Sequence, residues 1–137
     1  MILDASVILK WFLDETESNI ALGLKESHVT GTFTIVAPDI LIYEVGNALR
    51  YEPEFSPDEV NCCLEELYEL NIDIIAPISD IVNLITEIAY QKDITFYDAS
   101  YIALAQSLNL QYITADEKLY NKVKAFSFVT LLKLMQL

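Results

Sequence analysis

Positively charged residues are scarce in this chain. Lys and Arg together number 8, against 21 Asp and Glu, which gives a formal net charge of −13. So acidic a balance argues against a non-specific nucleic-acid binder, because neutralising backbone phosphates requires a basic surface. It does not exclude a nucleic-acid enzyme that works with metal ions, since a bound cation is often the largest charge in a site.

Cysteine and histidine are nearly absent. Cys62 and Cys63 are adjacent and have no other partner, so a disulfide framework is excluded and a reducing compartment is expected. The single histidine, His28, falls in a predicted loop before Gly31, and we expect it to be a solvated surface residue. A catalytic pair of histidines is therefore excluded.

Long hydrophobic runs are missing too. No stretch of about 18 uninterrupted apolar residues occurs, which argues against a membrane span. Segment Met1–Leu13 is apolar, but it lacks the basic leading region of a signal peptide and carries Asp4 instead. We therefore expect a cytoplasmic protein without membrane association.

Glycine and proline, at 3 and 4 positions, are too few for a disordered segment, and 53% of the residues are hydrophobic. The length of 137 residues fits one folded domain spanning 1–137. Short apolar strands alternate with helical periodicities, which predicts an α/β fold with a mainly parallel sheet covered on both faces. We expect the apolar tail, residues 130–137, to close the core, extend the sheet or meet a partner chain. The predicted strands are 1–3, 34–37, 72–76, 111–114 and 125–129, and the predicted helices are 6–13, 17–27, 39–50, 57–70, 79–91, 97–107 and 117–124.

Four acids stand where a parallel sheet would place a ligand, beyond the carboxyl ends of its strands. Asp4 directly follows the first predicted strand, and Asp116 lies two residues after the strand that ends at Thr114. Asp98 opens a predicted helix, and Glu44 projects from an otherwise apolar helix face. An inward carboxylate is costly unless it is paired or binds a metal.

Each acid also has an ordinary interpretation. Asp4 and Asp116 suit helix caps, Asp98 suits the first turn of a helix, and Glu44 suits a side chain that reaches solvent. Their joint placement favours a functional site over any single structural role. A donor set of carboxylates without His or Cys suits Mg²⁺ or Mn²⁺ rather than zinc, and such ions recur in phosphodiester hydrolysis.

Four segments around these acids carry a family resemblance. They are Met1-Ile2-Leu3-Asp4-Ala5-Ser6, Glu44-Val45-Gly46-Asn47-Ala48-Leu49, Tyr97-Asp98-Ala99 and Thr114-Ala115-Asp116-Glu117-Lys118-Leu119. In this order and at this spacing they resemble the PIN-domain family, and more narrowly the VapC-type toxins of toxin–antitoxin pairs. The resemblance extends over nearly the whole chain.

The resemblance implies a three-layer α/β/α sandwich with Mg²⁺- or Mn²⁺-dependent endoribonuclease activity. It also implies a homodimer and a cognate antitoxin protein of the VapB type as partners. By the resemblance, the catalytic and metal-binding acids are Asp4, Glu44, Asp98 and Asp116, with Ser6 and Thr114 as supporting polar residues.

The mechanistic hypothesis is in-line attack of a metal-activated water on an RNA phosphodiester, which leaves a 5′-phosphate and a 3′-hydroxyl. Because Lys and Arg are few, only a small number of basic residues can contact RNA phosphates. The basic residues expected near the site are Lys10, Arg50, Lys118, Lys122 and Lys124.

Three other functions compete with this one. A catalytically inactive PIN-like protein-interaction module is the main alternative, and the complete acidic set argues against it. A response-regulator receiver would need an adjacent acid pair after the first strand, but Asp4 is followed by Ala5. A phosphatase of the DxDxT type would need an acid where Ser6 stands.

Overall fold

The computed structural model describes residues 1–135 and contains a five-stranded, wholly parallel sheet. The strand order is β3-β2-β1-β4-β5. In register, Ile2 of β1 stands opposite Val36 of β2 on one side and Tyr112 of β4 on the other. The strands are β1 (Ile2–Leu3), β2 (Val36–Pro38), β3 (Asp73–Ile75), β4 (Tyr112–Thr114) and β5 (Val129–Leu131).

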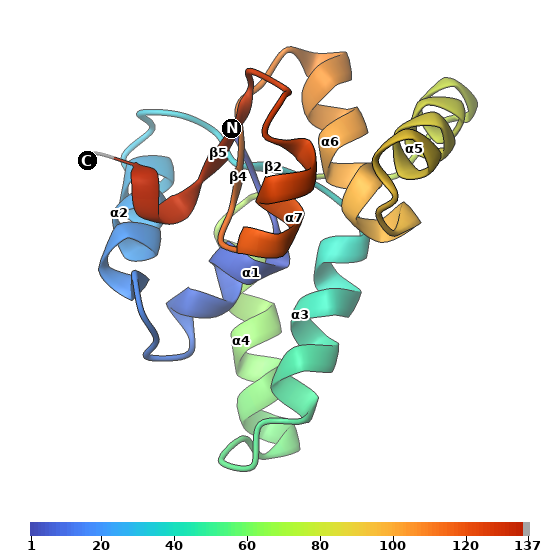
Figure 1. Cartoon of the computed structure of the whole chain (residues 1–137). Helices are drawn as coiled ribbons and strands as arrows, with labels where there is room; N and C mark the ends of the chain where they lie inside the picture. The colour runs from blue at the N-terminus through green and yellow to red at the C-terminus, as the bar shows by residue number, and fades with distance from the viewer. Residues whose placement is uncertain (136–137) are drawn as a thin grey trace.

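Within residues 1–135, seven α-helices connect and cover these strands (Figure 1). Helix α6 packs against β1, β2 and β4, and Figure 1 shows α2 on the opposite side of the sheet. Helices α3 and α4 lie side by side and extend away from the sheet, while α5 lies along α6. The helices are α1 (Ala5–Ile8), α2 (Ser18–Val29), α3 (Ile40–Arg50), α4 (Pro57–Glu69), α5 (Ser79–Lys92), α6 (Phe96–Leu108) and α7 (Glu117–Val123), with 3₁₀ turns at Leu9–Trp11 and Leu132–Leu134.

The strand order changes direction between β1 and β4, which are neighbours in the sheet. This place is the topological switch point of the sheet. The chain builds β1, β2 and β3 outward on one side and then returns to place β4 on the other side of β1. The central strands β1, β2 and β4 are buried along their whole lengths, as expected when helices cover both faces. A crevice at the carboxyl ends of β1 and β4 is the usual ligand position in such sheets.

The predicted α/β sandwich with a parallel sheet is confirmed, and six of the seven predicted helices are present within two residues of their predicted ends. The predicted helix 6–13 is shorter: α1 ends at Ile8, and a 3₁₀ turn follows over Leu9–Trp11. The start of α4 follows its sequence signals. The Ser56 side chain accepts a hydrogen bond from the Glu59 amide, and Pro57 takes the first helical position.

The last predicted strand, 125–129, is wrong. Residues 124–128 form turns, and β5 runs from Val129 to Leu131. The apolar residues Phe126 and Phe128 pack against each other with ring centroids 5.3 Å apart. These side chains therefore stabilise a turn and do not belong to a strand. The beginning of the tail therefore extends the sheet, and buried Leu132 closes the core. The expectation for residues 136–137 lies outside the described residues.

The expectation of a solvated His28 is also wrong. Its Nε2 lies 2.6 Å from the Leu70 carbonyl oxygen, and its Nδ1 accepts a hydrogen bond from the Ile35 amide. The imidazole therefore ties the end of α2 to the end of α4 and to the residue before β2. Within residues 1–135 no helix has the length and hydropathy to cross a membrane. The cytoplasmic location stays a prediction.

Candidate functional site

Asp4 lies at the carboxyl end of β1 and is only 6% exposed. As predicted, it caps α1: its Oδ1 accepts hydrogen bonds from the Ser6 amide at 3.0 Å and from the Val7 amide at 3.4 Å. The Ser6 hydroxyl donates to the same oxygen at 2.5 Å, and the Tyr112 hydroxyl donates to Oδ2 at 2.5 Å. Burial raises the pKa of Asp4, and these hydrogen bonds lower it in part.

Ser6 and Thr114 connect the ends of β1 and β4. The Ser6 Oγ accepts a hydrogen bond from the Ala115 amide at 2.9 Å and lies 3.4 Å from the Thr114 Oγ1. Thr114 is fully buried, and its Oγ1 accepts a hydrogen bond from the Asp116 amide at 3.1 Å. The two hydroxyls thus hold the turn that carries Asp116 beside the end of β1.

Asp116 and Asp98 stand in first turns of helices. Asp116 caps α7 by accepting a hydrogen bond from the Leu119 amide at 3.0 Å. The Asp98 amide donates to the Thr95 hydroxyl, which caps α6, so the Asp98 carboxylate is not needed for capping. Burial raises the pKa of Asp98, and the negative charges of Asp4 and Asp116 raise it further.

Glu44 lies in α3 and is half-buried. Its Oε1 accepts a hydrogen bond from the Tyr101 hydroxyl at 2.7 Å. Burial raises the pKa of Glu44, and the negative charges of Asp4 and Asp98 add to this effect. The four acids, which come from four separate elements, therefore form one electrostatically coupled group.

No Lys or Arg in residues 1–135 forms a salt bridge with any of these four acids. Their carboxylates present an all-oxygen donor set without a neutralising side chain, which fits a hard divalent cation. In the same part of the chain, no three His, Cys, Asp or Glu side chains converge into a complete ion cage. Mg²⁺ usually keeps several waters and binds through one or two carboxylates, so a site for this ion needs no closed cage.

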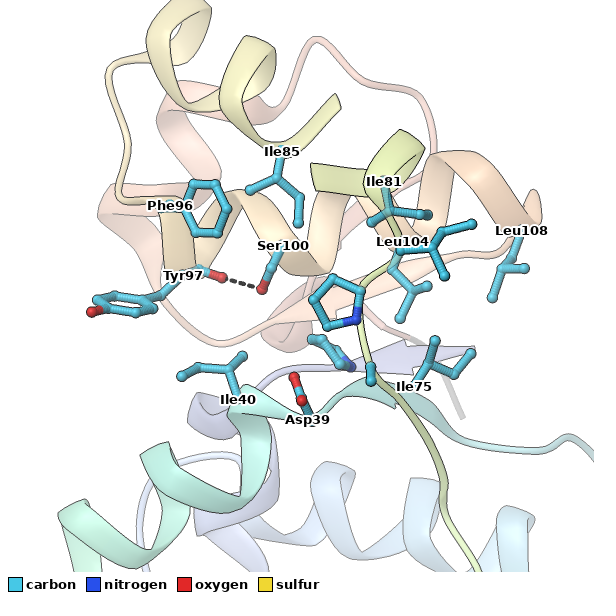
Figure 2. A pocket seen from close by; sticks show the side chains of 14 residues that line it. Asp39, Ile40, Ile75, Ile81, Ile85, Phe96, Tyr97, Ser100, Leu104 and Leu108 are labelled. Carbon is cyan, nitrogen blue, oxygen red and sulfur yellow. Dashed lines mark hydrogen bonds between the residues drawn. The ribbon is translucent and has the colours of Figure 1, made fainter. Parts of the chain in front are cut away.

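A cleft of about 470 Å³ opens beside two of the four acids. Asp98 and Asp116 line it together with Lys118 and Lys122 of α7. A second cavity, of about 320 Å³, is almost wholly apolar and lies between α5, α6 and the segments that follow β2 and β3 (Figure 2). Figure 2 shows Ile85 and Ile81 around this cavity, with the Ser100 hydroxyl turned to the Tyr97 carbonyl.

Among the basic residues expected near the site, Lys10 is a wrong prediction. It is buried, donates to the Thr16 carbonyl at 2.7 Å and forms ion pairs with Glu15 and Glu17. Arg50 ends α3, where its guanidinium stacks on the Tyr51 ring. Only Lys118 and Lys122 of the five expected residues line the cleft that holds Asp98 and Asp116.

Two residues that contact the acids were not expected from the sequence. Tyr101 and Tyr112 donate to Glu44 and Asp4, and both rings are buried. In the sequence they are only members of the predicted helix 97–107 and the predicted strand 111–114. The sequence signal that could have identified them is the tyrosine hydroxyl, because a buried hydroxyl requires a hydrogen-bond partner.

The parallel sheet and the acids at its switch point define an α/β domain of a known type. The family model described as "PIN domain" matches residues 1–125, so the chain belongs to the PIN-domain family. The resemblance to VapC-type proteins is confirmed as well.

The chain is 28% identical over 129 residues to ribonuclease VapC3 of Pyrobaculum aerophilum, covering 91% of this chain and 95% of that protein. It is 32% identical over 124 residues to ribonuclease VapC1 of Mycobacterium tuberculosis, covering 86% of each chain. Among solved structures, a toxin–antitoxin complex from Klebsiella pneumoniae matches with a TM-score of 0.70 and 17% identity, covering 94% of each chain.

Proposed function

We propose that this protein is a divalent-metal-dependent endoribonuclease, the toxin of a VapBC-type toxin–antitoxin pair. The observation that carries the proposal is the coupled group of Asp4, Glu44, Asp98 and Asp116 at the switch point, with pKa values of three of them raised and no salt bridge to neutralise them within residues 1–135. The names of two relatives that match over most of their length, ribonucleases VapC3 and VapC1, support the substrate class.

The four acids are the proposed metal ligands. When bound, Mg²⁺ or Mn²⁺ supplies positive charge and activates water for attack on phosphorus. Asp98 and Asp116 face the cleft where a phosphodiester would enter, while Asp4 is held deeper by Ser6 and Tyr112. We propose hydrolysis that leaves a 5′-phosphate and a 3′-hydroxyl.

The experiment that tests this function is incubation of the purified chain with a mixed-sequence single-stranded RNA in Mn²⁺, in Mg²⁺ and in EDTA. Cutting only with metal, with 5′-phosphate ends on the products, supports the proposal. Products ending in a 2′,3′-cyclic phosphate would overturn the hydrolytic route. No cutting together with no calorimetric Mn²⁺ binding would favour the inactive interaction module, which the incomplete ion cage in residues 1–135 keeps as the second candidate.

We propose that RNA docks through Lys118 and Lys122, which lie one turn apart on α7 in the cleft that holds Asp98 and Asp116. These two cations offset part of the negative charge of Asp93, Asp98 and Asp116, which line the same cleft. Lys122 keeps its place by donating to the Asp93 carbonyl at 2.7 Å, and its ion pair with the exposed Asp93 carboxylate is weak.

Replacing Lys118 or Lys122 by Gln is expected to weaken RNA binding and its salt dependence. Each lost phosphate contact should reduce the slope of log K against log salt by about 0.7. Binding of labelled RNA in an Asp98→Asn background, where the RNA stays intact, measures this. The control is Lys124→Gln, an exposed lysine at the end of the same helix that does not line the cleft. Equal slopes in all variants would contradict the docking proposal.

We also propose a homodimer and a VapB-like antitoxin as partners. The apolar cavity supports the dimer, because the large exposed side chains of Ile78, Phe96, Tyr97 and Leu108 gather around it. Such a patch usually marks an interface. The proposal of an antitoxin partner rests on the VapC-type relatives alone.

Ile78→Lys is expected to convert the dimer into a monomer, because a charge would be desolvated in the apolar interface. Light scattering of the purified protein measures the mass. Val29→Lys is the matched control, since Val29 is 64% exposed and Ile78 is 65% exposed, but Val29 ends α2 and does not line the cavity. A mass unchanged by Ile78→Lys, or already that of one chain in the unsubstituted protein, would contradict this interface.

A further inference from the structure

Two tyrosines are stacked directly behind the acidic site. Tyr101 of α6 and Tyr112 of β4 have ring centroids 6.0 Å apart and an interplanar angle of 14°. Both side chains are almost completely buried, at 1% and 0% exposure. Their rings therefore have little freedom to move relative to each other.

Each hydroxyl joins one acid to the element that carries another acid. Tyr101 lies on α6, three residues after Asp98, and donates to Glu44 of α3 at 2.7 Å. Tyr112 lies on β4, which leads to Asp116, and donates to Asp4 of β1 at 2.5 Å. The two hydrogen bonds and the ring stack thus link Glu44 to Asp4, and the two tyrosines lie on the elements that carry Asp98 and lead to Asp116.

The hydrogen bonds also decide which Asp4 lone pairs remain available. Oδ1 accepts from the Ser6 amide, the Ser6 hydroxyl and the Val7 amide, so both of its lone pairs are engaged. Oδ2 carries fewer donors: within residues 1–135 its hydrogen bond comes from the Tyr112 hydroxyl, and the Thr114 hydroxyl also lowers the pKa of this carboxylate. For Glu44, Oε1 accepts from Tyr101, and no hydrogen bond in this part of the chain reaches Oε2.

We propose that the stacked Tyr101–Tyr112 pair is a positioning device that fixes the separation of the Asp4 and Glu44 carboxylates and turns Asp4 Oδ2 and Glu44 Oε2 toward one cation. The inference rests on the proposed function, because it assumes that these acids bind metal. If the two tyrosines only packed the core, any hydrogen-bond partner would satisfy each hydroxyl. Here both hydroxyls select members of the same four-acid group, and groups that orient metal ligands in this way typically contribute substantially to affinity.

The test compares Tyr101→Phe, Tyr112→Phe and the double variant, which keep the rings and remove only the hydroxyls. Calorimetric Mn²⁺ affinity is expected to fall by about 10- to 100-fold for each single variant. RNA cutting should be lost at low Mn²⁺ and restored at high Mn²⁺. The matched control is Tyr43→Phe, next to Glu44 on α3 but 73% exposed, which should bind Mn²⁺ like the unsubstituted chain.

A second measurement separates positioning from packing. In a Glu44→Gln background, Tyr101→Phe should weaken Mn²⁺ binding no further, whereas Tyr112→Phe should still do so. If circular dichroism shows that Tyr112→Phe does not fold, the Mn²⁺ affinity of Tyr101→Phe decides the question. That variant is expected to fold, because Glu44 is half-buried and water can replace the lost hydroxyl. Unchanged Mn²⁺ affinity in the folded Phe variants overturns the positioning role. Absence of Mn²⁺ binding by the unsubstituted chain instead overturns the proposed function.

Discussion

Asp98→Asn is expected to abolish RNA cutting and at the same time to stabilise the metal-free protein. Asn keeps the shape of the side chain but removes the charge that a divalent cation requires. Loss of a group that acts together with others at the reaction centre lowers the rate by about 10³-fold or more. The measurement is the rate of RNA cleavage at saturating Mn²⁺, with folding checked by circular dichroism.

The expected gain in stability follows from the charges around Asp98. Burial and the negative charges of Asp4 and Asp116 raise its pKa, so the ionised side chain is destabilising in the absence of a cation. Its carboxylate is also dispensable for capping, since Thr95 caps α6. We expect the melting temperature of the metal-free variant to rise by about 2 to 5 °C.

Asp80→Asn is the control for both readouts. Asp80 is an exposed aspartate in the first turn of α5, as Asp98 is in the first turn of α6, but it lies outside the four-acid group. Its replacement should leave cleavage unchanged and lower stability slightly, because a favourable charge at a helix start is lost. Retained cleavage by Asp98→Asn, or a lower melting temperature than the unsubstituted chain, would contradict the functional assignment of this acid.

The fold was largely predictable because its signals are local. Ser56 and Pro57 mark a helix start by cap chemistry alone, and the alternation of strands with helices indicates a parallel sheet. The fifth strand was misplaced because strands of only 2–3 residues are defined by their partners. Val129 is in β5 because it pairs with Tyr112, and no local pattern separates it from the apolar turn that contains Phe126.

The candidate site was predictable in its acids and not in their surroundings. Asp4 and Asp116 follow strands directly, so the sheet topology alone brings them to one edge. Tyr101 reaches Glu44 across 57 residues of sequence, which no periodicity indicates. The position of Lys10 was wrongly predicted for a similar reason. Its burial depends on how the segment that contains Glu15 and Glu17 folds back over it.

The metal-free protein is expected to become more stable as the pH falls from neutrality toward the ordinary pKa values of Asp and Glu. Burial raises the pKa values of Asp4, Glu44 and Asp98 above the unfolded reference values of 3.8, 4.5 and 3.8, and nearby negative charges add to this effect at Glu44 and Asp98. For an acid with a raised folded pKa, the folded state binds more protons than the unfolded state. The free energy of unfolding therefore rises as the pH falls through the folded pKa, and the gain is complete only below the unfolded pKa. Urea unfolding at several pH values in EDTA measures the slope.

Saturating Mn²⁺ should reverse this dependence. At 100 times its dissociation constant, a ligand that binds only the folded state adds about 2.7 kcal/mol to the free energy of unfolding. Because carboxylates bind metal when deprotonated, the gain should be largest near neutral pH and disappear on acidification. The acidic surface as a whole also favours compactness at lower pH, so the decisive comparison is with a Glu44→Gln/Asp98→Asn variant. That variant should show a flatter slope in EDTA and little response to Mn²⁺. Stability of the unsubstituted chain that falls on mild acidification in EDTA would contradict the raised pKa values of Asp4, Glu44 and Asp98, and the electrostatic basis of the proposed metal site would be lost.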